Sequence, residues 1–328
     1  MLSRVLAFRP ASVLERLPPR SDACPLSLRD VLWAAGRGKL PAVEATGPGV
    51  IRAALVAAKV LRSTIGLAIP SGVAPEAWFE TVAAIADEIA AALPFFSSAL
   101  VALEGESALS VERGTREVWR LVEAGMTHVA VDASAVSPEE RGRILAQVSS
   151  PLQERGLGFD CIVPLGEPGA GRRAIALVEE LARRGAPADA VSVVCPAPPD
   201  LEAARAQLGA LDRLAEVLGE VAVFRRGAIS KALLAEVGGS RLRGCEDGGA
   251  AALRVGLPAE EGKGSAREAE RRARWRSRVV AVLGEEEAER LEARAFVTAA
   301  EFIEALGAEH SASAVARALE LRLAGDGP

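Results

Sequence analysis

The chain has 328 residues, of which 50% are hydrophobic and 25% charged, and its formal net charge is −5 at pH 7. This composition excludes a disordered or collagen-like chain, and the acidic balance argues against nucleic acid as the main partner. Charged residues and prolines interrupt every apolar stretch before the roughly 18 residues that a membrane span needs. The four cysteines form no CxxC pair. We therefore expect a soluble, cytoplasmic protein that binds neither nucleic acid nor a membrane.

The first 20 residues contain only one short apolar run, Val5 to Phe8, which is too short for a signal peptide. We expect residues 1–26 to form a loosely held N-terminal arm, with an organelle transit peptide as the alternative. From residue 40 onward, short apolar runs alternate with amphipathic stretches, as in repeated βα units. Eight strands are predicted, at residues 40–43, 64–69, 99–103, 128–132, 158–163, 190–195, 221–224 and 241–245. The predicted helices between them cover residues 50–61, 75–93, 111–124, 138–154, 170–184, 201–218 and 230–237.

This alternation predicts an α/β fold, a closed (β/α)8 TIM barrel over residues 27–255. An open doubly wound sheet would show a glycine-rich phosphate loop after its first strand, and none follows Val43. A polar, glycine-rich linker is predicted at residues 256–265. A helical C-terminal extension over residues 266–328 follows, with helices at 266–283, 285–293, 297–306 and 311–323. We expect the first of them to serve as the eighth barrel helix.

Active sites of such barrels lie at the C-terminal ends of the strands, which we call the mouth. The polar residues predicted there divide by charge, with carboxylates after the first five strands and arginines after the last two. This arrangement suits a polar ligand with an anionic end. The predicted mouth residues are Glu44, Ser71, Glu104, Glu106, Asp132, Ser134, Asp160, Glu167, Cys195, Arg225, Arg226, Arg243, Glu246 and Asp247.

The order of these motifs resembles the class II, metal-dependent aldolases, a family that includes fructose-bisphosphate and tagatose-bisphosphate aldolases. Residues 27–69 look like the family's opening helix and first two strands, and residues 99–134 look like its strand 3 motif and the following strand. In the latter, Val131-Asp132-Ala133-Ser134 is similar to the family's "IDGS" or "IDAS" sequence. The resemblance covers roughly residues 27–250, and it implies a phosphate site at strands 7 and 8.

The family binds its catalytic zinc with three histidines, and this chain departs from the family at all three positions. They correspond to Gly105, the Cys195–Pro198 turn and the Arg225–Arg226 loop. The two histidines, His128 at the start of a strand and His310 in the extension, do not substitute for them. The resemblance also matches Glu104 to the catalytic Asp and Arg243 to a strand 8 Asn. We expect no cofactor and no metal, although a magnesium site at Glu44, Glu104, Glu106 and Asp132 is the alternative.

None of the four lysines is predicted at a strand end, so a Schiff-base mechanism is not expected. We expect a degenerate, aldolase-like pseudoenzyme, a non-catalytic binding or scaffold subunit that forms a homo-oligomer such as a dimer or joins a companion protein. Its anion-binding pocket would use Arg225, Arg226, Arg243, Ser134 and Glu44. If no anion binds, we expect the arginines to pair with Glu104, Glu246 or Asp247.

Two other functions stay open. The first is a carbon–carbon lyase of altered chemistry that acts on a phosphorylated or carboxylated small molecule, with Glu104 or Glu106 as acid or base and Asp132 as a third catalytic candidate. The second is a metabolite-binding regulator. Cys161 and Cys195 are expected to be buried structural thiols rather than nucleophiles.

Overall fold

The computed structural model describes residues 2–163, 170–247 and 266–325. The linker predicted at 256–265 and the candidate Glu167 lie outside these ranges. Within the ranges, no helix is both long and apolar enough to cross a bilayer.

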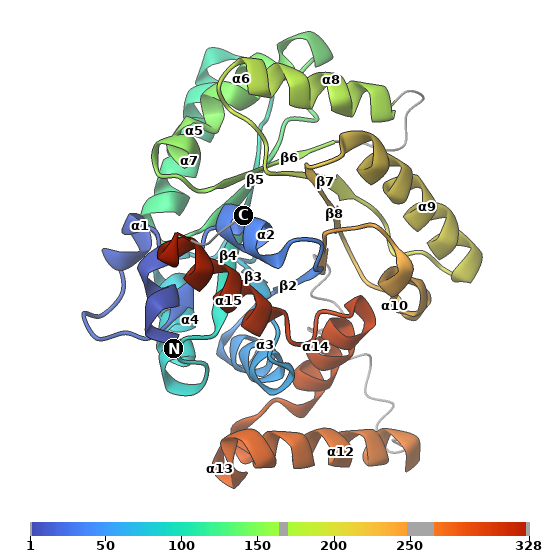
Figure 1. Ribbon diagram of the computed structural model, residues 1–328. Coiled ribbons are helices and arrows are strands. Elements are labelled where there is room, and N and C mark those ends of the chain that lie inside the picture. The colour runs from blue at the N-terminus through green and yellow to red at the C-terminus, as the bar shows by residue number, and fades with distance from the viewer. Residues whose placement is uncertain (1, 164–169, 248–265, 326–328) are drawn as a thin grey trace.

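Eight parallel strands form a closed barrel surrounded by helices (Figure 1), which confirms the predicted TIM-barrel fold. The ring closes because the first barrel strand pairs with the last and the third pairs with the fourth. Each predicted strand has an observed counterpart. The barrel strands are β2 (Leu40–Glu44), β3 (Ile65–Ala68), β4 (Pro94–Ala102), β5 (His128–Asp132), β6 (Gly158–Ile162), β7 (Ala190–Val194), β8 (Ala222–Arg226) and β9 (Gly244–Asp247).

The helices that cover the barrel bury one apolar face against the outer side of the strands. The helix predicted at 138–154 is divided in two at Ser149, and Pro151 lies in the first turn of the second part. The helices between the strands are α3 (Pro48–Leu61), α4 (Pro75–Ile89), α5 (Ala108–Glu123), α6 (Pro138–Val148), α7 (Ser150–Glu154), α8 (Ala170–Arg183), α9 (Leu201–Leu218) and α10 (Lys231–Glu236).

The N-terminal segment is packed against the barrel, so the expectation of a loosely held arm is wrong. It contains a 3-10 helix, η1 (Leu2–Phe8), then α1 (Ala11–Leu14), β1 (Cys24–Pro25) and α2 (Leu28–Ala35). β1 pairs with β4, and Leu26 joins Phe96 and Phe224 in one buried cluster. Apolar side chains from this segment therefore close the N-terminal end of the barrel.

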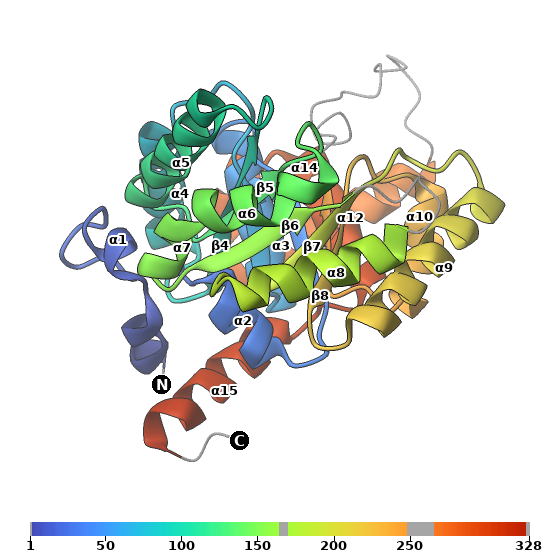
Figure 2. The ribbon, with the colours of Figure 1, turned by 90° about the horizontal axis from the view of Figure 1, so that it is seen from above.

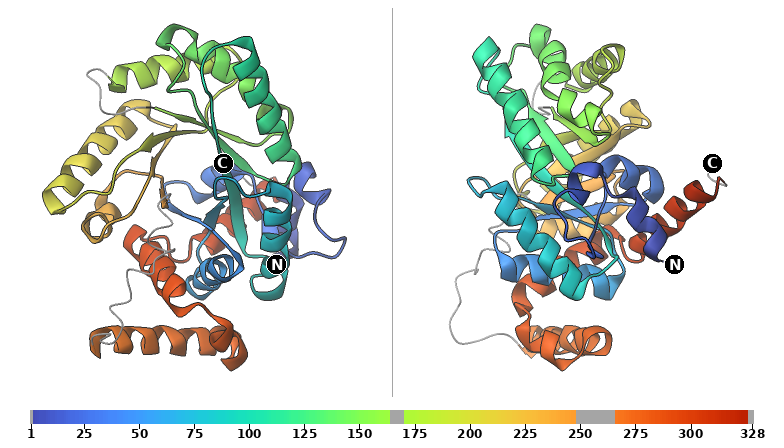
Figure 3. Two further views of the ribbon diagram at one scale, coloured as in Figure 1. Left: turned by 180° about the vertical axis from the view of Figure 1, so that it is seen from behind. Right: turned by 90° about the vertical axis from the view of Figure 1, so that its left-hand side faces the viewer.

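The eighth barrel helix is α14 (Ala293–Leu306), not the helix at 266–283 as expected. α14 packs against α3 and β2 and buries Phe296 and Ile303. The arginine-rich α12 (Ala266–Leu283) and the short α13 (Glu285–Arg290) lie outside it (Figure 3). The last helix, α15 (Ser311–Ala324), packs on α2 and η1 at the N-terminal end of the barrel (Figure 2).

Candidate functional site

Alternation along the strands decides which predicted residues reach the barrel interior. Consecutive side chains of a strand point to opposite faces, so only one of the neighbours Arg225 and Arg226 faces inward. Arg226, on β8, bonds to Asp160 on β6 although β7 lies between those strands, and such a contact is made only through the interior. Arg225 points outward and donates to Gln207 on α9 at 2.9 Å.

Arg226 is the centre of a buried polar cluster that we call the interior ionic network. Its guanidinium donates to Glu246 Oε1 at 2.5 Å, to Asp160 Oδ2 at 3.1 Å and to Ser192 Oγ at 2.9 Å. Ser98 Oγ, on β4, donates to Glu246 Oε2 at 3.2 Å. The exposed fraction is 4% for Arg226 and zero for Asp160. The network therefore links five strands across the inside of the barrel and contains the predicted partner Glu246.

The network keeps Asp160 ionised. Burial acts to raise the pKa of this carboxyl, but His128 and the charge of Arg226 outweigh burial, and the pKa lies below its ordinary value. His128 Nε2 is 3.4 Å from Asp160 Oδ2, and the ring packs edge-on against Phe96 and Phe224. Neither histidine nitrogen makes an aligned hydrogen bond to the described residues. The histidine is fully buried, away from the mouth.

Arg225 has a structural role that differs from the predicted ligand role. It is fully buried, and its guanidinium donates to the carbonyls of Gly227 at 2.7 Å, Ala228 at 2.9 Å and Pro196 at 3.1 Å. These carbonyls belong to the loops that follow β7 and β8. Arg225 therefore ties two mouth loops together from outside the barrel, and it has no exposed surface at which to meet a ligand.

Arg243 lies at the opposite end of the barrel from the predicted site. The strand expected to begin at residue 241 begins at Gly244, so Arg243 precedes β9. Its guanidinium donates to the carbonyl of Leu32 at 3.2 Å and to that of Gly38 at 3.4 Å. The three arginines predicted to converge at the mouth are therefore separated into one interior, one exterior and one at the N-terminal end.

The predicted mouth carboxylates do not form a shared site. Glu104 is exposed and pairs with Arg113 at 2.7 Å. Glu106, also exposed, accepts from the Ser137 hydroxyl at 2.7 Å, and this bond lowers the pKa of the carboxyl. A carboxyl group with a lowered pKa is a poor general acid near neutral pH.

The remaining predicted ligands are at strand ends. Asp132 Oδ1 accepts from the Ser134 backbone N–H at 2.8 Å, a local turn bond, and Ser134 itself is exposed. Glu44 ends β2 and is half-buried, and Ser71 is exposed in the loop after β3. Across the described ranges, no group of three or more His, Cys, Asp or Glu side chains could hold a metal ion.

Apolar side chains that the sequence analysis missed face the mouth above the interior ionic network. Leu100 is two residues after Ser98 on β4, and Val194 is two residues after Ser192 on β7. Side chains two residues apart on a strand point to the same face, so Leu100 and Val194 point inward as the two serines do. Their exposed fractions are 51% and 58%. Because polar catalytic groups are expected here in an active barrel, these exposed apolar residues are a notable departure.

The thiols agree with a structural role. Cys161 is fully buried and Cys195 nearly so. Burial raises the pKa of both thiols, which keeps them protonated. A protonated thiol is a weak nucleophile.

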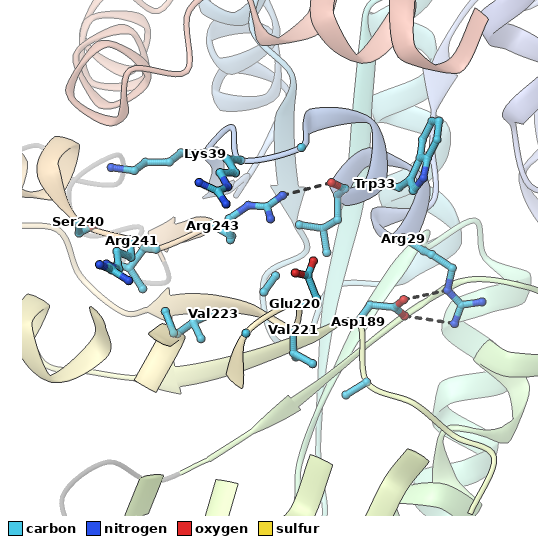
Figure 4. Close-up of a pocket in the computed structure, with 18 residues that line it drawn as sticks. Arg29, Trp33, Lys39, Asp189, Glu220, Val221, Val223, Ser240, Arg241 and Arg243 are labelled. Atoms are coloured by element: carbon cyan, nitrogen blue, oxygen red, sulfur yellow. Dashed lines mark hydrogen bonds and ion pairs between the residues drawn. The ribbon is translucent and has the colours of Figure 1, made fainter. Parts of the chain in front are cut away.

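A second region missed from the sequence is a groove at the N-terminal end of the barrel, with a volume of about 1070 Å³ (Figure 4). Its walls come from α2 and the residues after it and from the segments that precede β7, β8 and β9. Arg243 lies in this groove, together with Arg37, Lys39 and Arg241.

No family model and no curated protein matches this chain. Similar solved structures include the YdjI aldolase from Escherichia coli K12, with 13% identity, a TM-score of 0.54 and coverage of 85% of this chain and 95% of that chain. A putative fructose-1,6-biphosphate aldolase from Coccidioides immitis has 15% identity, a TM-score of 0.50 and coverage of 87% and 97%. A probable tagatose 6 phosphate kinase from Sinorhizobium meliloti 1021 has 16% identity, a TM-score of 0.51 and coverage of 88% and 99%.

At these identities the likeness concerns the fold and carries no site residue with it. Two of the three structures bear aldolase names, and each is covered over nearly its whole length. The chain therefore has an aldolase-like TIM-barrel fold.

Proposed function

We propose that this chain is a non-catalytic, aldolase-like barrel that acts as a binding or scaffold subunit. The observation that carries the proposal is the interior ionic network. Arg226 extends into the space inside the barrel, and Asp160 and Glu246 already neutralise its charge. An inward-facing arginine with two carboxylate partners has little remaining affinity for a substrate anion.

The residues also do not fit the zinc of the family that the sequence resembles. A catalytic zinc needs three protein ligands and one open position. The corresponding positions hold Gly105, the Cys195–Pro198 turn and the Arg225–Arg226 loop. His128 is buried beside Asp160, and His310 precedes α15. A guanidinium at the third position is a donor only and has no lone pair with which to ligate zinc.

A scaffold role implies a protein partner, and we infer either a second copy of the chain or a companion subunit in the cytoplasm. The exposed Leu100 and Val194 support this inference, because apolar side chains at the mouth favour contact with a protein surface over contact with a sugar phosphate. A bound phosphorylated or carboxylated metabolite at the mouth is the less favoured variant, since Arg225 and Arg243 point away from it.

One observation favours the alternative, a carbon–carbon lyase of altered chemistry. Asp132 ends β5, is half-buried, and accepts a single hydrogen bond, at Oδ1, from the described chain. Its second oxygen could therefore act as a general base toward a substrate at the mouth. Glu104 and Glu106 are less suited, because both are exposed and already paired.

Metal analysis and turnover assays test the proposal on the purified full-length chain. We expect far less than one zinc per chain and no cleavage of fructose 1,6-bisphosphate or tagatose 1,6-bisphosphate, with or without added zinc. A matched Asp132→Asn variant separates the two functions. Turnover of a phosphorylated or carboxylated substrate that disappears in Asp132→Asn would establish the lyase and overturn the non-catalytic role.

A further inference from the structure

The groove at the N-terminal end of the barrel, which we call the N-terminal groove, is rich in positive charge (Figure 4). Five cationic side chains and two carboxylates line it, a net charge of +3 in a chain whose total is −5. Asp189 is already paired with Arg29 at 2.9 Å. Four cations therefore share the groove with one remaining carboxylate, Glu220.

None of these four cations pairs with a carboxylate of the described chain. Lys39 donates to the carbonyls of Val237 and Gly238, and Arg243 likewise donates only to carbonyls. The guanidinium groups of Arg37 and Arg241 are exposed and make no side-chain hydrogen bond or ion pair within residues 2–163, 170–247 and 266–325. Their donors are available to an incoming ligand.

The electrostatics agree with this geometry. Burial and, to a smaller degree, the neighbouring Arg37 lower the pKa of Arg243, while Glu220 opposes them. Burial also lowers the pKa of Lys39, and the nearby charge of Asp212 opposes this effect. Positive charge is therefore held in a partly desolvated groove with only partial compensation, and an anion would relieve its cost.

We propose that the N-terminal groove binds a small molecule that carries two or more phosphate groups. Its volume of about 1070 Å³ is just above the usual range for small-molecule sites, which leaves room for a ligand with two phosphate groups. Guanidinium groups bind phosphate through paired, charge-assisted hydrogen bonds. Glu220 is placed to accept from a ligand hydroxyl, and the exposed ring of Trp33 is at the rim. This site is independent of the proposed function, because it lies at the other end of the barrel.

Calorimetry with inorganic pyrophosphate tests the proposal. The test variant is Arg37→Ala/Arg241→Ala, because neither guanidinium supports the described fold and the variant should fold normally. The control is Arg116→Ala on α5, an arginine that is also exposed, makes a long contact of 3.6 Å with Glu112 and does not line the groove. We expect saturable binding to the wild type, at least tenfold weaker binding to the double variant, and no change in the control.

Trp33 offers a local readout. Pyrophosphate should change the tryptophan fluorescence of the wild type, and Trp33→Phe should remove that change. Failure of the wild type to bind pyrophosphate, or equal binding by the double variant, would overturn the proposal. Equal affinity for a tetraglutamate peptide would overturn the assignment to phosphate. Binding that is changed by Asp132→Asn and not by the double variant would place the ligand at the mouth and would also overturn the groove proposal.

Discussion

The two ends of the barrel use arginine in opposite ways. In the interior below the mouth, Arg226 is buried between Asp160 and Glu246, and its charge is paired with their carboxylates. In the N-terminal groove, Arg37 and Arg241 are exposed and have no carboxylate partner in the described chain. In most barrel enzymes, the side chains that bind an anionic ligand lie at the mouth. The state of pairing of the arginines, rather than their number, therefore indicates where an anion can bind.

The strongest test of this comparison is Arg226→Ala. It removes the shared guanidinium partner of two buried carboxylates, so that within the described chain Asp160 retains only Ser192 and His128, and Glu246 retains only Ser98. We expect the free energy of unfolding to fall by about 3–5 kcal/mol. Urea denaturation at neutral pH measures the change.

A triple variant, Arg226→Met/Asp160→Leu/Glu246→Leu, provides the control for that experiment. Since all three charges are removed together, it should be clearly more stable than Arg226→Ala. A triple variant as unstable as the single variant would show that packing, and not the unpaired charges, causes the loss.

The next effect concerns Arg225, which joins the mouth loops from outside the barrel. Arg225→Met retains most of the side-chain volume but leaves the carbonyls of Gly227, Ala228 and Pro196 without their donor. We expect a loss of about 1.5–3 kcal/mol in the free energy of unfolding, as for hydrogen bonds to a charged group. A change below about 0.5 kcal/mol would mean that water replaces the guanidinium and that the loops do not depend on it.

The acid sensitivity of the network gives a third prediction. The pKa of Asp160 is lower in the folded chain than its ordinary value of 3.8, so the stability it contributes is complete above that value. This contribution to stability is lost as the pH falls below 3.8 and through the lower pKa that Asp160 has in the folded chain. Asp160→Asn should therefore show a smaller loss of stability than the wild type between about pH 5 and about pH 2. Urea unfolding measures this stability at each pH. Urea midpoints that fall equally steeply with pH in the wild type and in Asp160→Asn would refute the lowered pKa of Asp160.

The smallest effect is expected in the groove. Arg37→Ala/Arg241→Ala should change the free energy of unfolding by less than about 0.5 kcal/mol, because both side chains are exposed and unpaired in the described chain. Thermal unfolding checks this expectation. A loss comparable to that of Arg226→Ala would show that these arginines stabilise the fold and would remove the contrast between the two ends.

The alternation of strands and helices was predictable because each barrel strand is an apolar run bounded by polar turns. β5 has the bounds that the sequence predicts, and α9 and α12 do as well. The position of α14 was not predictable from periodicity. α12 precedes it in the chain, and only packing against α3 and β2 distinguishes the two.

The site was predicted poorly for two physical reasons. Parallel strands buried on both faces read as continuous apolar runs, so the sequence of β8 does not show which of Arg225 and Arg226 faces inward. The available signal was that the polar residues Ser98, Asp160 and Ser192 lie on largely apolar strands, which indicates a polar interior that an inward-facing arginine could join. The second reason is the short length of the last barrel strand, β9. β9 begins at Gly244, three residues later than predicted, and in so short a strand this shift moves Arg243 from the mouth to the other end.

Calorimetry with fructose 1,6-bisphosphate on two variants tests the central contrast most directly. Asp132→Asn changes the mouth, and Arg37→Ala/Arg241→Ala changes the N-terminal groove. We expect the wild type to bind this bisphosphate without cleaving it, the mouth variant to bind with unchanged affinity, and the groove variant to bind at least tenfold more weakly. Binding that depends on Asp132 and not on the groove arginines would instead place the anion site at the mouth and refute the groove site.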